Sequence, residues 1–354
     1  MNYAARLKQV QEQLPRLNCD ALLIEETTDL LYLTGLELSL GKILITKETA
    51  DLIVDGRYLE VSQQQTLYRV ISLKDFNQEK WCKKQEVKQL GFDSLSTSFA
   101  AFEVLKKATE KSLTTLVALP APLQPLRLIK DAKEIELLRK AAKLNVEGFY
   151  YLTSLLKDGI CEKELVLELE IFWKKKGAKE LSFEPIIAFG KNSSMPHYRS
   201  TDFSLKENTH ILIDIGVAYH HYHSDMTRVL YWGEPENEIK KIYKIVQEAK
   251  NYAMELCRPG TAVDQLDHIA RGWITSKGYG PYFNHNLGHG VGLNVHEAPS
   301  LKVQKEPEKT ILQAGMVLTI EPGIYLPGIG GVRLEDTLLI TKEGYENLTS
   351  TPHY

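Results

Sequence analysis

The segment HILIDIGVAYHHYHSDMTRVLYW, residues 210–232, places two acidic side chains within strongly apolar, strand-like sequence. Asp214 stands in ILIDIG, and Asp225 follows at hairpin distance, at the start of the next strand-like run. A carboxylate surrounded by isoleucine, leucine and valine carries a large desolvation cost unless a partner neutralises its charge. The segment therefore predicts a hairpin with two carboxylates that another group must neutralise.

A second segment repeats this arrangement. VLTIEPGIYLPGIGGVRLEDT, residues 317–337, carries Glu321 in one strand-like run and Glu335 in the next, and the glycines of 327–331 allow a tight return. Four converging carboxylates repel one another, so the arrangement is stable only with cations. Hard oxygen ligands suit divalent ions of the magnesium and manganese type.

One imidazole completes this candidate metal site. His289 lies in NLGHGVGL, where glycines on both sides let the backbone and a metal approach closely. Imidazole moves the preference toward transition metals, so we rank manganese first, followed by cobalt, zinc or iron. Each feature alone has a plainer interpretation, since an acid in a strand is commonly a hydrogen-bonded structural residue and GHGVG can be a tight turn. The prediction depends on all of them occurring in one half of the chain.

The chain of 354 residues is too long for one ordinary core, and its two halves differ in pattern. Short apolar runs at 21–24, 42–46, 51–58, 69–73 and 114–119, with the helical pattern FEVLKKATEK between them, predict an α/β layer. The proline-rich LPAPLQPLRLIKD then resists helix and strand alike. We place the boundary here and predict domains at 1–125 and 126–354.

The second half alternates helical and strand-like patterns. Apolar residues at helical spacing predict helices over 135–152, entered at Asp131, and over about 238–256 and 263–274, the last stopping at Gly278. HILIDIGVAY, SDMTRVLYW, MVLTIEPGIY and GVRLEDTLLIT are strand-like. These patterns predict a mostly antiparallel sheet backed by helices.

The composition excludes several classes of protein. No apolar stretch approaches the length of a membrane helix, and the N-terminus lacks a secretory core, so we expect a soluble cytoplasmic protein. The four cysteines are scattered singly, which argues against a zinc ribbon or a disulfide framework. A net charge of -3 provides no basic field for nucleic acid.

These motifs resemble a known family. The strings DIGVAYHHYHSDMTRV, HNLGHGVGLNVHEAP, TIEPGIYLPGIGGVRLEDT and MPHY are similar to the signature segments of the M24 metallopeptidases with the pita-bread fold, which include Xaa-Pro aminopeptidases and Xaa-Pro dipeptidases (prolidases). DLLYLTG and LIVDGRY resemble pieces of the creatinase-type N-terminal domain. The resemblance implies an α/β creatinase-like domain followed by an α+β pita-bread catalytic domain.

The resemblance also implies a role for each site residue. It assigns Asp214 to one of two divalent ions, His289 and Glu321 to the other, and Asp225 and Glu335 to both. Glu321 would also act as the acid–base group. His296 would contact the substrate and stabilise the tetrahedral oxyanion or the departing nitrogen, with His285 and His197 as further active-site histidines. Thr227 is expected to bond a ligand carboxylate, and Arg333 to pair with the acids around Glu335.

Within the resemblance, the choice between two peptidases depends on one position. A dipeptidase must bind the free carboxylate of its substrate, for which arginine is the natural partner, but Ser300 follows the HEAP motif and no arginine stands between it and Glu321. We therefore predict an Xaa-Pro aminopeptidase acting on peptides with proline in second position, with the dipeptidase as the alternative. A non-catalytic peptide-binding module is a more remote alternative. From the resemblance we expect a homodimer.

Overall fold

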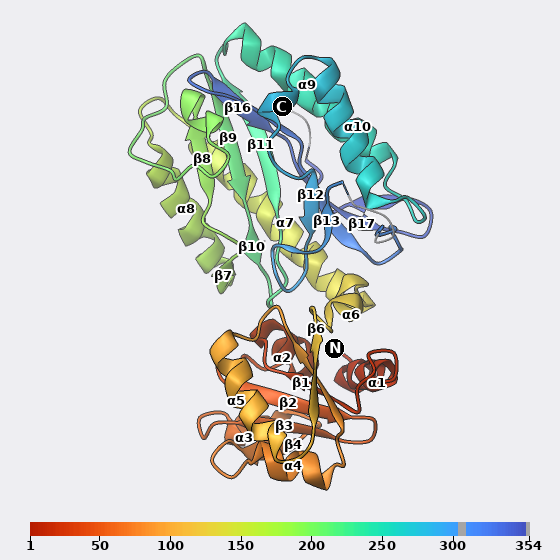
Figure 1. Cartoon of the computed structure of the whole chain (residues 1–354). Helices are drawn as coiled ribbons and strands as arrows, with labels where there is room; N and C mark the ends of the chain where they lie inside the picture. The colour runs from red at the N-terminus through yellow and green to blue at the C-terminus, as the bar shows by residue number, and fades with distance from the viewer. Residues whose placement is uncertain (304–308, 352–354) are drawn as a thin grey trace. The chain divides into compact units, whose positions relative to one another are not determined.

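The computed structural model describes residues 1–303 and 309–351, and it divides the chain into two compact units, Met1–Arg127 and Leu128–Tyr354 (Figure 1). The predicted boundary between 125 and 126 stays a prediction. No helix in the described parts of the chain combines the length and apolarity that crossing a bilayer requires.

The first unit is built around a six-stranded sheet with the order β4-β3-β2-β1-β5-β6. Its strands are β1 (Ala21–Ile24), β2 (Gly41–Thr46), β3 (Ala50–Val54), β4 (Arg69–Ser72), β5 (Gln89–Asp93) and β6 (Thr115–Leu119). Its helices are α1 (Tyr3–Gln13), α2 (Thr27–Thr34), α3 (Leu59–Gln65), α4 (Gln78–Lys84) and α5 (Phe99–Glu110). The three pairs that involve β4, β5 and β6 are parallel, and the other two are antiparallel, so the predicted α/β layer is present.

The apolar runs of the sequence correspond to five of these strands, whereas β5 was not predicted. Its sequence QLGFD lacks a continuous apolar run because Gly91 interrupts it. The sheet needs this glycine, since a Cβ there would lie 2.8 Å from both Cys19 Sγ and Leu119 Cδ1.

The proline-rich segment corrects one expectation. It contains the short helix α6 (Gln124–Leu128), although the density of proline predicted neither helix nor strand. Pro125 is the second residue of this helix, where a missing backbone N–H breaks no intrahelical bond.

The second unit contains four long helices: α7 (Ala132–Leu155), α8 (Glu162–Lys175), α9 (Asn237–Glu255) and α10 (Val263–Ser276). Helix α7 begins at a capping box, in which the Asp131 side chain accepts from the backbone N–H of Glu134 and the Glu134 side chain accepts from that of Asp131. Helices α9 and α10 pack side by side and bury their apolar residues in the largest core of the unit (Figure 1).

Two antiparallel sheets of this unit carry the site: β11-β9-β8, and β13-β12-β14-β17-β18. The strands of the unit are β7 (Glu180–Leu181), β8 (Ile186–Phe189), β9 (Thr209–Ile215), β10 (Val217–Ala218), β11 (Met226–Trp232), β12 (Gly288–Gly290), β13 (Glu297–Leu301), β14 (Val317–Ile320), β15 (Gly323–Leu326), β16 (Gly330–Arg333), β17 (Asp336–Ile340) and β18 (Tyr345–Asn347), with 3-10 helices η1 (Gly190–Ser194) and η2 (Gly280–Tyr282). The predicted antiparallel character is present.

The second predicted hairpin is present, but its four strands are divided between two sheets. Strands β15 and β16 form the hairpin around the glycine-rich turn, while β14 and β17 pair in the larger sheet. Glu321 lies at the junction of β14 and β15, and Glu335 at the junction of β16 and β17. Each glutamate therefore stands where its strand leaves one sheet for another.

Candidate metal centre

The structure brings all five predicted ligands together. Three groups of side chains have ligand atoms within 4.8 Å of one another: Asp214 with Asp225 and Glu335, His289 with Glu321 and Glu335, and Asp225 with His289 and His296. Asp225, His289 and Glu335 each belong to two of these groups, so the three groups form one continuous cluster.

The first carboxylate pair is held by the β9–β11 hairpin. Asp214 is in β9 and lies directly opposite Thr227 of β11, and Asp225 precedes β11 by one residue. The backbone carbonyl of Asp225 accepts a hydrogen bond from Thr337 Oγ1 at 2.7 Å, which ties this hairpin to β17. Both aspartates are buried.

The second pair is joined to the first through Thr227. Its Oγ1 donates to Glu335 Oε2 at 2.7 Å, and its backbone carbonyl accepts from the Glu335 N–H at 3.1 Å. Because a single threonine bonds both the backbone and the side chain of Glu335, that carboxylate has a defined direction. The prediction that Thr227 bonds a ligand carboxylate agrees with this geometry.

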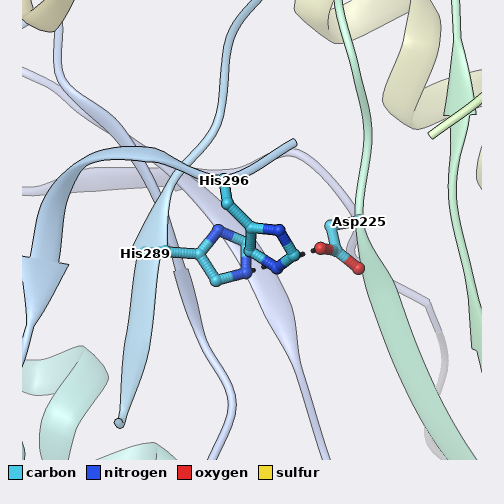
Figure 2. Close-up of side chains that lie close together, drawn as sticks. All are labelled: Asp225, His289 and His296. Carbon is cyan, nitrogen blue, oxygen red and sulfur yellow. Dashed lines mark ion pairs between the residues drawn. The ribbon is translucent and has the colours of Figure 1, made fainter. Parts of the chain in front are cut away.

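Two histidines complete the cluster. His289 Nε2 lies 3.6 Å from Asp225 Oδ2 and 3.4 Å from Glu321 Oε1. Its Nδ1 lies 3.1 Å from the carbonyl of Gly290, which favours a proton on Nδ1 and leaves Nε2 free to bind a metal. Figure 2 shows the rings of His289 and His296 beside Asp225. The centroids of the two rings are 4.2 Å apart.

Burial and crowding strongly perturb the titration of this cluster. Burial, followed by the charges of neighbouring carboxylates, raises the pKa of Asp225 and Glu321 well above the usual range, and raises that of Glu335 to about 7. Burial, with a smaller contribution from the charge of His296, lowers the pKa of His289 to about 4. At neutral pH the histidine is therefore neutral, as a metal ligand must be.

Two buried oxygens identify what the cluster needs. Asp214 Oδ1 and Glu335 Oε1 have no hydrogen-bond partner among the described residues. An unpaired buried carboxylate oxygen is costly, and these two belong to the same group of ligand atoms. Four carboxylates and one imidazole, without sulfur, form a donor set that fits divalent metal ions.

One buried cation opposes the carboxylates. Arg333 donates to Asp214 Oδ2 at 2.5 Å, to the Tyr325 hydroxyl at 2.8 Å and to Thr227 Oγ1 at 3.2 Å. The sequence predicted that Arg333 pairs with acids around Glu335, and its partner is Asp214. The charge of Arg228 also lowers the pKa of Glu335, but two guanidinium groups cannot neutralise four carboxylates, so the charge argument for divalent cations still holds.

The two remaining predicted histidines lie near the cluster. His285 Nε2 is 2.9 Å from the Tyr325 hydroxyl, and burial, followed by the charge of Arg333, lowers the pKa of His285 to about 4. His197 is exposed, and its charge contributes to lowering the pKa of both His285 and His296, after burial as the larger cause. The structure thus places His197 within electrostatic reach of both.

The metal-free chain should lose stability as pH rises above about 7.5. Below this value two effects oppose each other as pH rises: buried histidines with a lowered pKa, such as His289, increase the stability of the fold, and buried carboxyls with a raised pKa decrease it. Above about 7.5 the histidines are neutral in both states, whereas the folded chain still holds carboxyl protons that the unfolded chain has lost, so the free energy of unfolding falls. Thermal melts of chelator-treated protein between pH 7.5 and 8.5 test this, and a melting temperature that rises with pH would contradict it.

Sequence reasoning missed two buried charged residues that support the site. Glu162 at the start of α8 is completely buried, and Lys130 donates to Glu297 at 2.7 Å beside His296. Both are charged residues in ordinary polar stretches of sequence, so no local pattern marks them. Ser300 lies directly opposite His289 in the β12–β13 pair, and residues 304–308 of the arginine-free segment lie outside the described residues.

Comparison with protein families agrees with this geometry. The model of metallopeptidase family M24 matches residues 136–342, and that of the creatinase/prolidase N-terminal domain matches residues 6–129. The chain belongs to metallopeptidase family M24. Its two domains are therefore a creatinase-type N-terminal domain and an M24 domain with the pita-bread fold.

Similar M24 proteins include peptidases of both predicted kinds. The Xaa-Pro dipeptidase of Pyrococcus horikoshii is 38% identical over 98% of this chain and 97% of its own. The structure of an Xaa-Pro dipeptidase from Bacillus anthracis has a TM-score of 0.93 at 33% identity, covering 100% of this chain and 99% of that one. The X-Pro aminopeptidase of Thermotoga maritima has a TM-score of 0.85 at 32% identity, covering 97% and 99%. These similarities favour the dipeptidase, the stated alternative, over the aminopeptidase indicated by Ser300.

Proposed function

We propose that this M24 metallopeptidase hydrolyses the bond between an N-terminal residue and proline in Xaa-Pro dipeptides. The observation that carries the proposal is the cluster of four carboxylates and His289, with two buried carboxylate oxygens that lack partners among the described residues. The similarity to Xaa-Pro dipeptidases over nearly the full length of the chain supports the choice of substrate.

The same cluster supports a site for two divalent ions. Asp214, Asp225 and Glu335 would hold one ion, and His289, Glu321, Asp225 and Glu335 the other, with manganese ranked first for this oxygen-rich set. Such ions lower the pKa of water and polarise a carbonyl group. Residence in the cytoplasm and assembly as a homodimer are also proposals, which rest on composition and family resemblance.

The protein's own groups would then handle protons and charge. Glu321, which lies within the cluster at the junction of β14 and β15, can take a proton from the attacking water and give it to the departing proline nitrogen. His296, exposed beside His289, can donate a hydrogen bond to the oxyanion that forms on the scissile carbonyl. His285 and His197 would contact the substrate around them.

A second candidate is favoured by one position. Ser300 faces His289 across the β12–β13 pair, and its hydroxyl lies 3.3 Å from the amide nitrogen of Asn286, so the side chain at this position is neutral. A neutral side chain here does not require a free carboxylate at the second residue. This favours an Xaa-Pro aminopeptidase that accepts longer peptides.

The deciding experiment compares two substrates. Manganese-supplemented enzyme is given Ala-Pro and Ala-Pro-Ala in parallel, with chelator-treated enzyme as the control. Faster release of alanine from Ala-Pro would support the dipeptidase, and faster release from Ala-Pro-Ala would support the aminopeptidase. Equal turnover of Ala-Pro and Ala-Ala would contradict the proline preference of both.

A further inference from the structure

A carboxylate outside the metal centre organises the segment that presents His197. Glu162, the first residue of α8, is 0% exposed, yet within the described part of the chain no cation bonds its carboxylate. Its oxygens accept from five donors, all of them uncharged and all within residues 189–201. A buried carboxylate held only by neutral donors is unusual, because burying a charge without a cation is costly.

The donors stand on both sides of His197. Glu162 Oε1 accepts from the backbone N–H of Phe189 and from Asn192 Nδ2, both at 2.9 Å. Its Oε2 accepts from the Tyr198 hydroxyl at 2.7 Å and from the backbone N–H and hydroxyl of Thr201 at 2.9 and 3.2 Å. The carboxylate therefore closes the ends of a loop whose middle carries His197.

Glu162 is held in place by helix α8, which packs tightly against its neighbours. Helix α8 buries Leu165, Leu169 and Trp173, and the Trp173 indole donates to the Leu144 carbonyl of α7 at 3.1 Å. Figure 1 shows α8 along β8, which directly precedes the loop. A carboxylate in the first helical turn also benefits from the helix dipole.

The loop reaches the metal centre at its middle. The carbonyl of Pro196 accepts from Arg333 at 3.5 Å, and Arg333 donates to Asp214. His197 follows Pro196 and is exposed, with a hydrogen-bonded tyrosine directly after it. The backbone on both sides of His197 is thus held in place, while the imidazole is presented to solvent beside the cluster.

We propose that Glu162 is a positioning residue for His197: its buried carboxylate fixes the loop 189–201 and so sets where the imidazole meets the peptide substrate. This inference rests on the proposed peptidase function, because it assigns His197 a contact with substrate. Glu162 touches neither the metal ligands nor the substrate and acts through the loop alone.

The proposal predicts a specific form of non-additivity. Glu162→Gln keeps the shape of the side chain but replaces one carboxylate oxygen, an acceptor, with an amide NH₂ group, a donor. This NH₂ group would face the N–H and O–H donors of the loop, so the loop shifts. Because a displacement of about 1 Å costs up to about 100-fold in rate, kcat/KM for the better of Ala-Pro and Ala-Pro-Ala should fall by about 10- to 100-fold. In His197→Ala the loop no longer has an imidazole to position, so adding Glu162→Gln should lower kcat/KM by no more than about twofold further.

The matched control lies on the same helix. Glu168 accepts from the Tyr151 hydroxyl at 2.8 Å, so Glu168→Gln applies the same substitution to a glutamate that bonds α7. This variant should retain the parental kcat/KM. Calorimetric titration with Mn²⁺ adds a readout besides activity: Glu162→Gln should bind the ion with unchanged stoichiometry and affinity.

Each outcome decides the proposal. Losses that multiply in the double variant, or Mn²⁺ binding that weakens along with activity, would overturn it, because Glu162 would then act through the fold or the metal centre. If Glu162→Gln does not fold, Tyr198→Phe replaces it, since this change removes one donor to Glu162 and should be equally non-additive with His197→Ala. A parent enzyme inactive on every Xaa-Pro peptide would overturn the proposed function and this inference together, whereas an active parent with multiplicative losses would overturn the inference alone.

Discussion

Asp225→Asn should lower the rate of Xaa-Pro hydrolysis about a thousandfold or more and, in the same variant, raise the melting temperature of the metal-free chain. Asp225 shares ligand groups with Asp214, Glu335 and His289, so an amide there removes charge from both proposed ion positions. The loss of activity follows because the variant holds divalent ions weakly.

The gain in stability has the opposite sign for a physical reason. Burial and the charges of Glu335, Asp214 and Glu321 raise the pKa of Asp225 well above its usual range, so the ionised form opposes folding when no metal is bound. A neutral amide removes this repulsion, and a tenfold change in the proton affinity of a carboxylate corresponds to about 1.4 kcal/mol. The effect should grow as pH rises above about 4, because the unfolded carboxyl loses its proton there while the folded carboxyl, with its raised pKa, retains it to higher pH.

The measurement pairs thermal melts of chelator-treated protein with kinetics of the manganese-loaded enzyme. Asp51→Asn is the matched control, because Asp51 is also buried but accepts from Arg69 and from the Trp81 indole in the first unit. That variant should be less stable than the parent and retain its activity. A metal-free Asp225→Asn chain that melts below the parent would show that Asp225 is a structural acid and not a metal ligand.

The metal cluster could be predicted from the sequence because its signal is local. Asp214 and Glu321 stand among aliphatic residues in strands, where a charge is costly, and Asp225 and Glu335 follow at distances that a hairpin brings together. The pairing of β9 with β11 realises the first of these hairpins directly. Physical cost and local geometry thus indicate each pair of acids, and the fold brings the two pairs together.

Some supporting contacts could not be predicted from the local sequence because their signal is tertiary. Glu162 stands in CEKELVLELE, which has the pattern of a helix with a solvated acidic face, and only the packing of residues 189–201 over it makes it buried. The partner of Arg333 is similar: Asp214 lies far away in the sequence and meets Arg333 only because the β15–β16 hairpin packs beside β9. Neither contact follows from periodicity or spacing.

The choice of substrate shows a different limit. Ser300 stands where a dipeptidase is expected to have an arginine, and this difference predicts an aminopeptidase. The structure places Ser300 opposite His289, as the argument about a substrate pocket requires. The similar dipeptidases nevertheless favour the other activity. A single pocket position cannot exclude a carboxylate partner supplied from elsewhere in the sequence, so the missing arginine was weaker evidence than similarity over the whole chain.

Arg333→Met should lower the free energy of unfolding of the metal-free chain by about 3–5 kcal/mol, the usual cost of removing one partner from a buried ion pair. The guanidinium is 5% exposed and contacts Asp214, Tyr325 and Thr227, so its loss leaves the charge of Asp214 without this cation. It also removes the positive charge that lowers the pKa of Asp225, Glu321 and Glu335.

The metal should offset part of this loss. Divalent ions supply the positive charge that the variant lacks, so the difference in melting temperature between Arg333→Met and the parent should shrink when manganese is added at pH 8. Arg69→Met is the matched control, because Arg69 pairs with buried Asp51 but is itself 53% exposed, which lets water replace the lost guanidinium at a cost of about 1 kcal/mol. A metal-free Arg333→Met chain no less stable than Arg69→Met would mean that the four carboxylates do not depend on this cation, and the electrostatic account of the cluster would fail.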